Sequence, residues 1–452
     1  MNIIIVGMGR VGSILVEELY REGHNIVAIE RDADLLQDCI NKFDIQGICG
    51  NGCNADVLRE AGVEKCDMIV SVMPQDENNI LCCMVARILG AKHLIARVRD
   101  PEYFAQFEFL REQLGMNMLI NPELSVAHEI VHILQFPAAK QIHAFSSGKV
   151  EVVEFKLPVG CKLDGMSLVE MKKRLKIPAL VVAVAHEDKI IIPHGNIVLH
   201  GGDIVSVCAG HFDLRAFFRT FGIFKQKAQS VMLLGGGEDV FYLAKELEDN
   251  GFFVKIICTT YERCLKMKSG LKKASVVCGD FTDRDVLERE GIDDADAVVS
   301  MSHYDENNIV TSMFARTRGV EKAITMLRGN SYKGILEEME LDTPVSPYRL
   351  AAAQVARYLR AIDVEQGGGV KAMYKIADDR VEALLFNVSA NEKFSGKALK
   401  ELNLEREVLI AAVIRGKYAY IPDGDFVLGD NDDLVVIAAD EKIYSLEDML
   451  RS

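Results

Sequence analysis

The chain of 452 residues lacks any concentration of positive charge. It carries 52 Lys and Arg against 67 Asp and Glu, a formal net charge of −15, and contains no basic block. Nucleic-acid binding depends on clustered Lys and Arg that neutralise phosphates, so the sequence argues against a DNA or RNA partner. The hydrophobic fraction of 49% and the charged fraction of 26% are those of an ordinary globular protein.

Long apolar runs are also missing. The longest, Ala179 to Ala185 and Val408 to Ile414, have the length of a strand, whereas a membrane-spanning helix needs roughly 18 apolar residues. Met1 and Asn2 lead directly into an apolar segment, so we expect no signal peptide. The eleven cysteines include no Cys-x-x-Cys pair, and we expect them to be reduced and mostly buried. These absences predict a cytoplasmic protein.

Catalytic motifs are absent as well. We find no nucleophile elbow, no P-loop and no pair of carboxylates in a recognisable pocket. The run from His128 to His132 matches the His-Glu-x-x-His pattern of zinc peptidases. It lacks a downstream third ligand, and the equivalent positions in the second half of the chain do not preserve it. We therefore predict a protein that is not an enzyme and holds no metal.

What the chain does contain is a duplication. A glycine-rich segment beginning at Gly7 recurs at Gly235, 228 residues later. Asp-Glu-Asn-Asn recurs 229 residues later, at 76 and 305, and so does an Ile-Pro-x-Gly segment whose proline is residue 193 and then 422. Three separated motifs in one register indicate two tandem repeats that can be compared with each other.

Each repeat is long enough for two domains. Short apolar runs alternate with helical patterns up to about residue 120, which predicts a doubly wound parallel sheet. The strands expected there are Ile3–Val6, Ile26–Ile29, Gly47–Cys49, Met68–Val72 and Leu94–Val98.

An amphipathic helix follows each of these domains, Pro122 to Leu134 in the first repeat and Pro347 to Leu359 in the second. Short strand-like runs then predict a small α+β module, and the glycines of 366–369 form the clearest flexible joint. The predicted fold class is therefore α/β, with two Rossmann-like domains, two crossover helices and two α+β modules. The predicted boundaries are 1–121, 122–142, 143–225, 229–346, 347–367 and 368–452.

The first glycine segment, Gly7-Met8-Gly9-Arg10-Val11-Gly12, follows a strand and opens a helix. In this context Gly7 permits a tight turn, Gly9 lets the backbone approach a pyrophosphate, and Gly12 lets the helix pack closely on the sheet. The helix N-terminus offers amide donors and partial positive charge to phosphates. Glu30, at the end of the second strand, can accept hydrogen bonds from ribose hydroxyls and disfavours a 2′-phosphate, although Arg31 stands beside it. These features predict a nucleotide site but do not separate NAD from ATP or ADP.

The second glycine segment is degenerate. Gly235 and Gly237 persist, but Val240 replaces the third glycine and Cys258 occupies the position of Glu30. Because the lost carboxylate removes a charge-assisted hydrogen bond, we expect this second site to bind a nucleotide weakly or to be vacant. Asp280 and Arg328 are its remaining candidates.

Further candidates follow other strands of the first domain. Asn51 follows the third strand, where a polar side chain can meet adenine or ribose, and Met73 and Pro74 follow the fourth. Arg97 and Arg99 end the fifth strand, where they either bind phosphates or form ordinary ion pairs. The Asp-Glu-Asn-Asn segment is expected to cap the helix after the fourth strand.

With these residues in view, the chain resembles the regulatory subunits of Trk potassium-uptake systems, a family of tandem RCK (or KTN) proteins. The resemblance covers the whole length and rests on the glycine segment, Glu30, Asp76-Glu77-Asn78-Asn79, Arg97 with its neighbours and the Ile-Pro-x-Gly segments. One departure is Asn51, where the family has an aspartate.

The resemblance implies a peripheral protein at the inner face of the membrane that binds NAD(H) or ATP/ADP and gates a separate potassium-translocating subunit. It also implies a homodimer or homotetramer. The alternatives are an NAD-dependent oxidoreductase and a regulator of another cation transporter. The predicted nucleotide contacts are Gly7, Met8, Gly9, Arg10, Val11, Gly12, Glu30, Arg31, Asn51, Met73, Pro74, Arg97 and Arg99, with Gly235, Gly237, Asp280 and Arg328 as weaker ones.

Overall fold

The computed structural model forms two compact units, one of residues 1–134 and 228–356, the other of residues 135–227 and 357–452. It describes the chain except residues 101–102, 105, 137–138, 147, 187–188, 194, 224–227, 330–331, 333–343, 366–369, 378–379, 389–392, 406, 440–442, 444 and 452. Among the described residues, no helix combines the length and the apolar character needed to cross a membrane.

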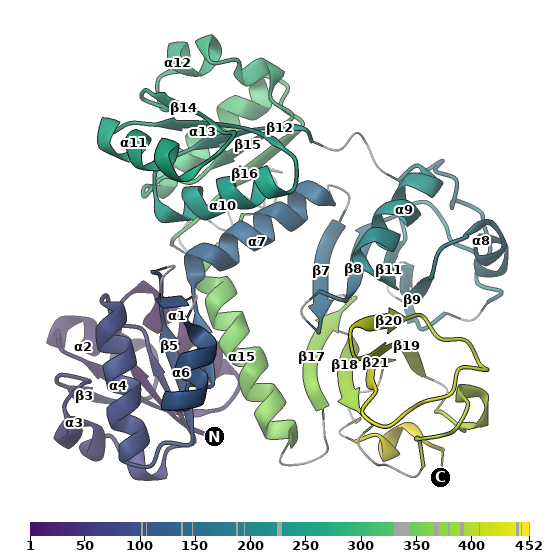
Figure 1. The fold of residues 1–452 in the computed structure, drawn as a ribbon, viewed down its shortest axis with the longest axis horizontal. Coiled ribbons are helices and arrows are strands. Elements are labelled where there is room, and N and C mark those ends of the chain that lie inside the picture. Colours follow the sequence, from purple (N-terminus) through teal and green to yellow (C-terminus); the bar gives the residue numbers. More distant parts are fainter. Residues whose placement is uncertain are drawn as a thin grey trace. The chain divides into compact units, whose positions relative to one another are not determined.

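The first Rossmann domain is a six-stranded parallel sheet in the order β3-β2-β1-β4-β5-β6, with helices on both faces (Figure 1). Its strands are apolar and buried on both sides, as a covered parallel sheet requires. The elements are β1 (Asn2–Val6), α1 (Arg10–Arg21), β2 (Asn25–Glu30), α2 (Ala33–Lys42), β3 (Gln46–Cys49), α3 (Ala55–Glu60), β4 (Met68–Ser71), α4 (Asp76–Ile88), β5 (His93–Arg97), α6 (Phe107–Leu114) and β6 (Met118–Ile120).

The second Rossmann domain repeats this topology as β14-β13-β12-β15-β16. Its elements are β12 (Ser230–Leu234), α10 (Glu238–Asp249), β13 (Phe253–Cys258), α11 (Tyr261–Gly270), β14 (Ser275–Cys278), α12 (Arg284–Arg289), β15 (Ala297–Ser300), α13 (Asp305–Thr317) and β16 (Lys322–Thr325). Both domains keep equivalent pairings, β1 between β2 and β4 and β12 between β13 and β15. The structure thus confirms the duplication.

The two connecting helices reach across the repeats. Helix α7 (Pro122–Gln135) follows the first Rossmann domain, but Val126, Ile130 and Leu134 pack into the core of the second one. Helix α15 (Pro347–Glu365) contacts the first domain, where Arg349 pairs with Glu18 of α1 at 3.2 Å. Figure 1 shows α7 beside α10 and α15 beside the first domain. Each helix therefore joins its own repeat to the other one.

The second unit contains two antiparallel modules with the strand orders β10-β9-β11-β8-β7 and β17-β18-β21-β19-β20. Strand β8 is buried on both faces because one face covers the module's own core and the other shares a core with the second module. The elements are β7 (Ala139–Phe145), β8 (Val150–Lys156), α8 (Leu168–Arg174), β9 (Ala179–His186), β10 (Lys189–Ile191), β11 (Ile204–Ala209), α9 (His211–Phe221), β17 (Val370–Ile376), β18 (Val381–Asn387), β19 (Val408–Arg415), β20 (Tyr418–Tyr420) and β21 (Asp433–Ala438).

The predicted fold class is confirmed, and the five expected strands of the first domain lie within one residue of the observed limits at each end. The prediction missed β6, and it ended the second connecting helix at Leu359, whereas α15 continues to Glu365. The joint at 366–369 lies outside the described residues. The six domain boundaries stay a prediction, since the two units combine segments from both repeats.

One expectation about the cysteines is wrong. Cys258 and Cys264 form a disulfide, whereas the sequence suggested that all eleven cysteines are reduced. The five residues between them span the turn from β13 into α11, which brings the two Cα atoms to 6.2 Å. The pair could not be predicted from a Cys-x-x-Cys spacing, because the turn between β13 and α11 brings the two residues together.

The helix exchange predicts where a core substitution in α7 has its effect. Ile130→Ala should lower the free energy of unfolding by about 2–5 kcal/mol, because it leaves a cavity in the second domain's core. Hydrogen exchange should accelerate in the β12 and β15 amides more than in the β1 and β4 amides. The matched control is Ile69→Ala, in the first domain's own core, which should show the reverse pattern. Faster exchange mainly in β1 and β4 for Ile130→Ala would contradict the assignment.

Candidate nucleotide-binding site

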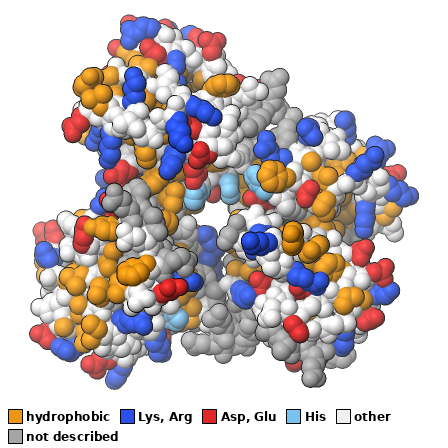
Figure 2. Space-filling view, viewed as in Figure 1, with side chains coloured by type: hydrophobic (Ala, Val, Ile, Leu, Met, Phe, Trp, Pro, Cys, Tyr) orange, Lys and Arg blue, Asp and Glu red, His pale blue; other side chains and the backbone are white. Residues whose placement is uncertain are grey.

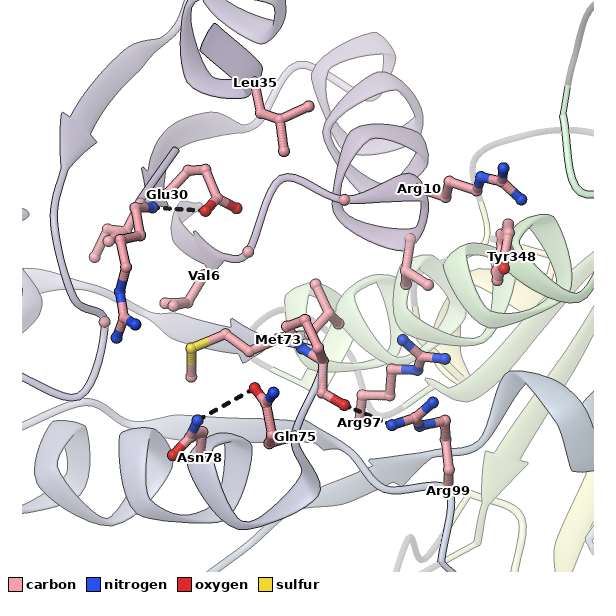
Figure 3. Close-up of a pocket in the computed structure, with 18 of the residues that line it drawn as sticks. Val6, Arg10, Glu30, Leu35, Met73, Gln75, Asn78, Arg97, Arg99 and Tyr348 are labelled. Carbon is pink, nitrogen blue, oxygen red and sulfur yellow. Dashed lines mark hydrogen bonds between the residues drawn. The ribbon is translucent and has the colours of Figure 1, made fainter. Parts of the chain in front are cut away.

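A cavity of about 800 Å³ opens at the carboxyl ends of the strands of the first Rossmann domain (Figure 3). Its walls come from the loops after β1, β2, β3, β4 and β5. The strand order reverses between β1 and β4, and such switch points are where parallel sheets bind ligands. The residues predicted from the sequence that line it are Gly7, Gly9, Arg10, Val11, Glu30, Arg31, Asn51, Met73, Pro74, Arg97 and Arg99.

The glycine loop has the geometry that its three glycines require. Gly7 has a φ of +99°, and a Cβ there would come within 3.1 Å of the Val72 and Met73 backbone. A Cβ on Gly9 would meet nothing within 4 Å, so the loop is open on the ligand side. A Cβ on Gly12 would stand 1.8 Å from the Gly7 carbonyl oxygen. Only glycine at this position lets α1 begin directly beneath the loop, with its first amides free to face the cavity.

Glu30 ties the glycine loop to the end of β2. Its Oε2 accepts a hydrogen bond from the Met8 amide at 2.6 Å, and its Oε1 accepts from the amides of Arg31 and Asp32 at 2.6 and 3.1 Å. An ionised carboxylate has about four acceptor positions, so one remains for a ribose hydroxyl. Met8 itself is buried and does not line the cavity. Its backbone, rather than its side chain, belongs to the site.

Three arginines gather at the opposite end of the cavity from Glu30 and Leu35, as Figure 3 shows for Arg10, Arg97 and Arg99. Arg97 pairs with Glu123 of α7 at 3.0 Å, and Arg99 donates to the Pro74 carbonyl. The buried Nε atoms of Arg97 and Arg99 make no hydrogen bond among the described residues, although Arg99 Nε lies 3.7 Å from the Asp76 carboxylate. This end of the cavity therefore combines ordinary ion pairs with three guanidinium groups in its wall, the side chains that suit an anionic ligand.

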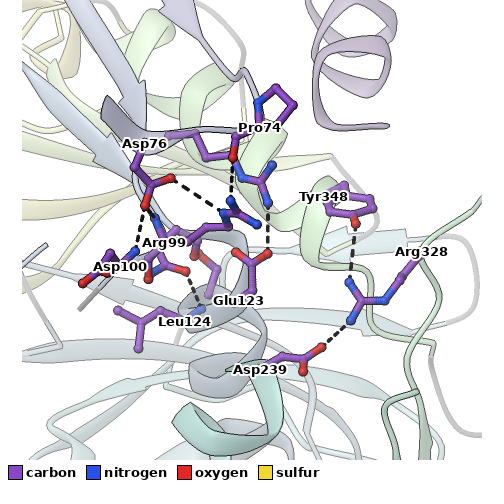
Figure 4. A network of polar contacts seen from close by, with 12 residues as sticks. Pro74, Asp76, Arg99, Asp100, Glu123, Leu124, Asp239, Arg328 and Tyr348 are labelled. Atoms are coloured by element: carbon purple, nitrogen blue, oxygen red, sulfur yellow. Dashed lines mark hydrogen bonds and ion pairs between the residues drawn. The ribbon is translucent and has the colours of Figure 1, made fainter. Parts of the chain in front are cut away.

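The Asp-Glu-Asn-Asn segment does not cap α4, contrary to the sequence expectation. The N-cap is Gln75, without a side-chain hydrogen bond. Asp76 instead accepts from the Arg99 and Asp100 amides, and buried Asn79 bonds the Met73 backbone and the Arg97 carbonyl. The segment thus fixes the loops that carry the cavity's methionine and arginines (Figure 4).

The second repeat contains the equivalent set of hydrogen bonds. Asp305 accepts from the amides of Arg328 and Gly329, and Asn308 bonds the Ser302 backbone and the Met326 carbonyl. The segment therefore belongs to the duplicated framework and not to the ligand contacts that distinguish the two copies.

The second Rossmann domain completes the wall of the first cavity, which the sequence did not suggest. His303, Tyr304 and Arg328 come from it, and Tyr348 comes from α15. Arg328, a candidate for the second site, thus faces the first one. Desolvation and the neighbouring Arg328 charge lower the pKa of His303 below its ordinary value of 6.5. No periodicity in the chain signals these contacts, because they depend on how the two repeats pack.

The remaining second-copy candidates lie away from this cavity. Gly235 keeps a positive φ of +147°, and Gly237 is the N-cap of α10. Asp280 accepts from the Thr282 amide and hydroxyl at 2.9 and 2.7 Å, and these hydrogen bonds lower the pKa of its carboxyl. Asn51 makes the corresponding turn contact to the Cys53 amide in the first domain, at 3.2 Å. Both residues therefore stabilise their loops.

The first histidine of the His-Glu-x-x-His segment forms an ion pair. His128 pairs with Glu246 of α10, which helps to hold α7 on the second domain. Within the part of the chain that the structure describes, no cluster of three or more metal-ligating side chains could hold a metal ion.

The surface in Figure 2 shows acidic and basic side chains interspersed over the visible face of both Rossmann domains.

Fold and cavity together define a tandem Rossmann-type protein with a ligand-sized cavity in its first domain. The chain matches the GsuK channel with a TM-score of 0.65 at 18% identity, over 97% of this chain and 77% of that one. The isolated GsuK RCK domain matches with a TM-score of 0.64 at 18% identity, over 97% and 92%. The GsuK channel bound to NAD gives a TM-score of 0.65 at the same identity and coverage as the GsuK channel. These likenesses show the shared fold.

The sequence comparisons identify the family. The TrkA-N domain model matches residues 3–122 and 231–347, and the TrkA-C domain model matches residues 152–222 and 384–451. The chain is 32% identical, over the full length of both proteins, to the Trk system potassium uptake protein TrkA homolog of Archaeoglobus fulgidus. It is 29% identical to TrkA of Vibrio alginolyticus, over 98% of this chain and 97% of that one. The chain belongs to the TrkA family, whose members here are named as potassium-uptake proteins and not as enzymes.

Two glycines of the loop should respond differently to alanine. Gly12→Ala should lower stability by about 1–3 kcal/mol and weaken nucleotide binding, because its Cβ overlaps the Gly7 carbonyl. Gly9→Ala should leave the fold intact, since its Cβ meets nothing, yet weaken binding by obstructing the approach of a pyrophosphate. Urea unfolding and calorimetry on both variants check this. Equal stability loss for the two would contradict the geometry.

His303 predicts a pH dependence. Its pKa is lowered in the folded state, so the folded protein binds fewer protons than the unfolded chain near the ordinary value of 6.5. The stability that it contributes is present above 6.5 and is lost as pH falls through the folded pKa. His303→Gln should therefore reduce the fall in unfolding free energy between about pH 7 and pH 5. Urea unfolding in that range measures this slope, and an unchanged slope would count against the assignment.

Proposed function

We propose that this protein is the nucleotide-binding regulatory subunit of a Trk-type potassium-uptake system. The observation that carries the proposal is the cavity at the switch point, with an acceptor at one end, arginine donors at the other and the glycine loop between them. The TrkA-family relatives, named for potassium uptake, supply the physiological context. The GsuK structures named as bound to NAD and to ADP support an adenine nucleotide as the ligand class.

The ligand's orientation follows from the chemistry of the two ends. The adenosine ribose hydrogen-bonds to Glu30, and the diphosphate lies against Gly9 and the N-terminus of α1. Asn51, Met73 and Leu35 then surround the adenine end. Whatever extends beyond the diphosphate, either further phosphate or a nicotinamide ribose, enters the region of the arginines. Both NAD(H) and ATP/ADP fit this orientation.

Regulation follows from the shared wall. A ligand in the first domain would touch His303, Arg328 and Tyr348, which belong to the second domain and to α15. Its charge would also compete with Glu123 of α7 for Arg97. Ligand binding thus changes forces on both connecting helices, and a coupling of ~1–3 kcal/mol is typical of such allosteric links. A membrane partner that favours one arrangement would respond to the nucleotide.

The proposal includes the setting of the protein. It would act at the inner face of the cell membrane, attached through a potassium-translocating subunit, and assemble as a homodimer or homotetramer. Two pseudo-equivalent halves suit symmetric packing between copies. The six-part division at residues 1–121, 122–142, 143–225, 229–346, 347–367 and 368–452 belongs to the same proposal.

Glu30→Gln tests the site. The amide keeps the size and one acceptor but loses the charge, so affinity for NADH, NAD, ATP or ADP should fall by roughly tenfold, the value of a charge-assisted hydrogen bond. Calorimetry against the four nucleotides gives affinity and stoichiometry, and potassium uptake in cells should lose its nucleotide response. Glu60→Gln, an exposed acid on α3, is the matched control. Unchanged affinity in Glu30→Gln would remove the support for this ligand position.

A further inference from the structure

A buried ion pair occupies the glycine loop of the second Rossmann domain (Figure 4). Asp239 corresponds to Val11 of the first copy, and Arg328 corresponds to Arg99. The two side chains pair directly, and each is more than nine-tenths buried. Arg328 also contacts the hydroxyl of Tyr348 at 3.4 Å. The first domain has no such acid in its loop, where position 11 is apolar.

The Asp239 carboxylate lies over the loop itself. Its Oδ1 accepts a hydrogen bond from the Val240 amide at 2.9 Å, in the first turn of α10. A Cβ built on Gly237 would meet the same oxygen at 2.3 Å, so the carboxylate covers the face of Gly237. A Cβ on the equivalent Gly9 of the first domain would meet nothing within 4 Å. The space that is open in one copy is filled by an anion in the other.

Electrostatics explain why the carboxylate stays there. Burial raises the pKa of Asp239, while the charge of Arg328 and the Val240 amide act in the opposite direction. The N-terminus of a helix also favours negative charge, which is the reason phosphates bind at such positions. The buried arginine needs an anion beside it, since removing one partner of a buried pair is strongly destabilising. The carboxylate thus meets the same demands that a phosphate would meet.

We propose that Asp239 is a built-in anion that fills the phosphate position of the second Rossmann domain, and that it limits the protein to one nucleotide per chain. The same pair holds Arg328, which lines the cavity of the first domain. Asp239 therefore decides the stoichiometry and fixes one wall of the first site. Only the stoichiometry of one nucleotide per chain depends on the proposed nucleotide binding at the first domain.

Restoring the second site tests the role of Asp239. All variants carry Glu30→Ala, which weakens the first site, and Glu30→Ala alone gives the residual binding to be subtracted. Val240→Gly with Cys258→Glu rebuilds the third glycine and the ribose acid but keeps Asp239. Adding Asp239→Val also opens the loop. Calorimetry with ADP should show at least about tenfold tighter binding for the variant with Asp239→Val than for the one that retains Asp239.

The possible results separate the proposals. Equal ADP binding by the two restored variants, or no gain over Glu30→Ala in either, overturns the role of Asp239. If Glu30→Ala binds ADP as tightly as wild type, the first-site proposal is overturned instead. The comparison of the two restored variants with each other does not depend on that result.

A second experiment replaces the missing carboxylate with inorganic phosphate, and it remains informative when the restored variants fold poorly. Asp239→Ala leaves Arg328 buried without its anion, so inorganic phosphate should raise the Tm of this variant more than that of wild type. Asp296→Ala is the matched control, because Asp296 accepts from the Gln229 and Ser230 amides at the opposite edge of the sheet. If Asp239→Ala does not fold, Asp239→Asn replaces it. Equal phosphate stabilisation of the Asp239 and Asp296 variants overturns the proposal.

Discussion

The contact between the Gly7 carbonyl and Gly12 is the constraint on which the first site depends. Because no side-chain atom stands between them, α1 starts directly under the loop that ends β1. That placement aims the first amides of the helix into the cavity and puts the Met8 amide within reach of Glu30. The acid at the end of β2 can then hold the loop and still keep one acceptor position for a ligand.

The duplicated copy shows what happens when the constraint is relaxed. Val240 takes the place of Gly12, and a Cβ on Gly235 would meet its side chain at 3.2 Å. Cys258 stands at the position of Glu30 and bonds to Cys264. What the second copy retains is the framework, since Asp305 and Asn308 keep the contacts of their counterparts. Framework and ligand contacts have therefore diverged separately, which is why the two halves keep one fold and offer different chemistry.

Much of this organisation could be predicted from the sequence, because it depends on local patterns. Apolar runs of strand length marked the β-strands of the first domain, and the spacing from Gly7 to Glu30 marked the cavity. What could not be predicted depends on packing between the repeats. Tyr348 lies far from the glycine loop in the chain and reaches the cavity only because α15 crosses to the first domain. Asp76 was misassigned for a related reason, since its partners on the loop after β5 are 23 and 24 residues away.

The exchange of connecting helices brings charged groups of both repeats to the cavity. Here Glu123 stands at the start of α7, whose apolar face is part of the second domain's core. Arg328 stands in that second domain and is anchored by Asp239. A phosphate placed among the arginines would repel Glu123 and attract Arg328, so its charge would act on the second domain through two groups with opposite signs. The interaction energy of such a ligand would depend on how the two Rossmann domains are arranged. A shift in the populations of two arrangements requires a difference of this kind.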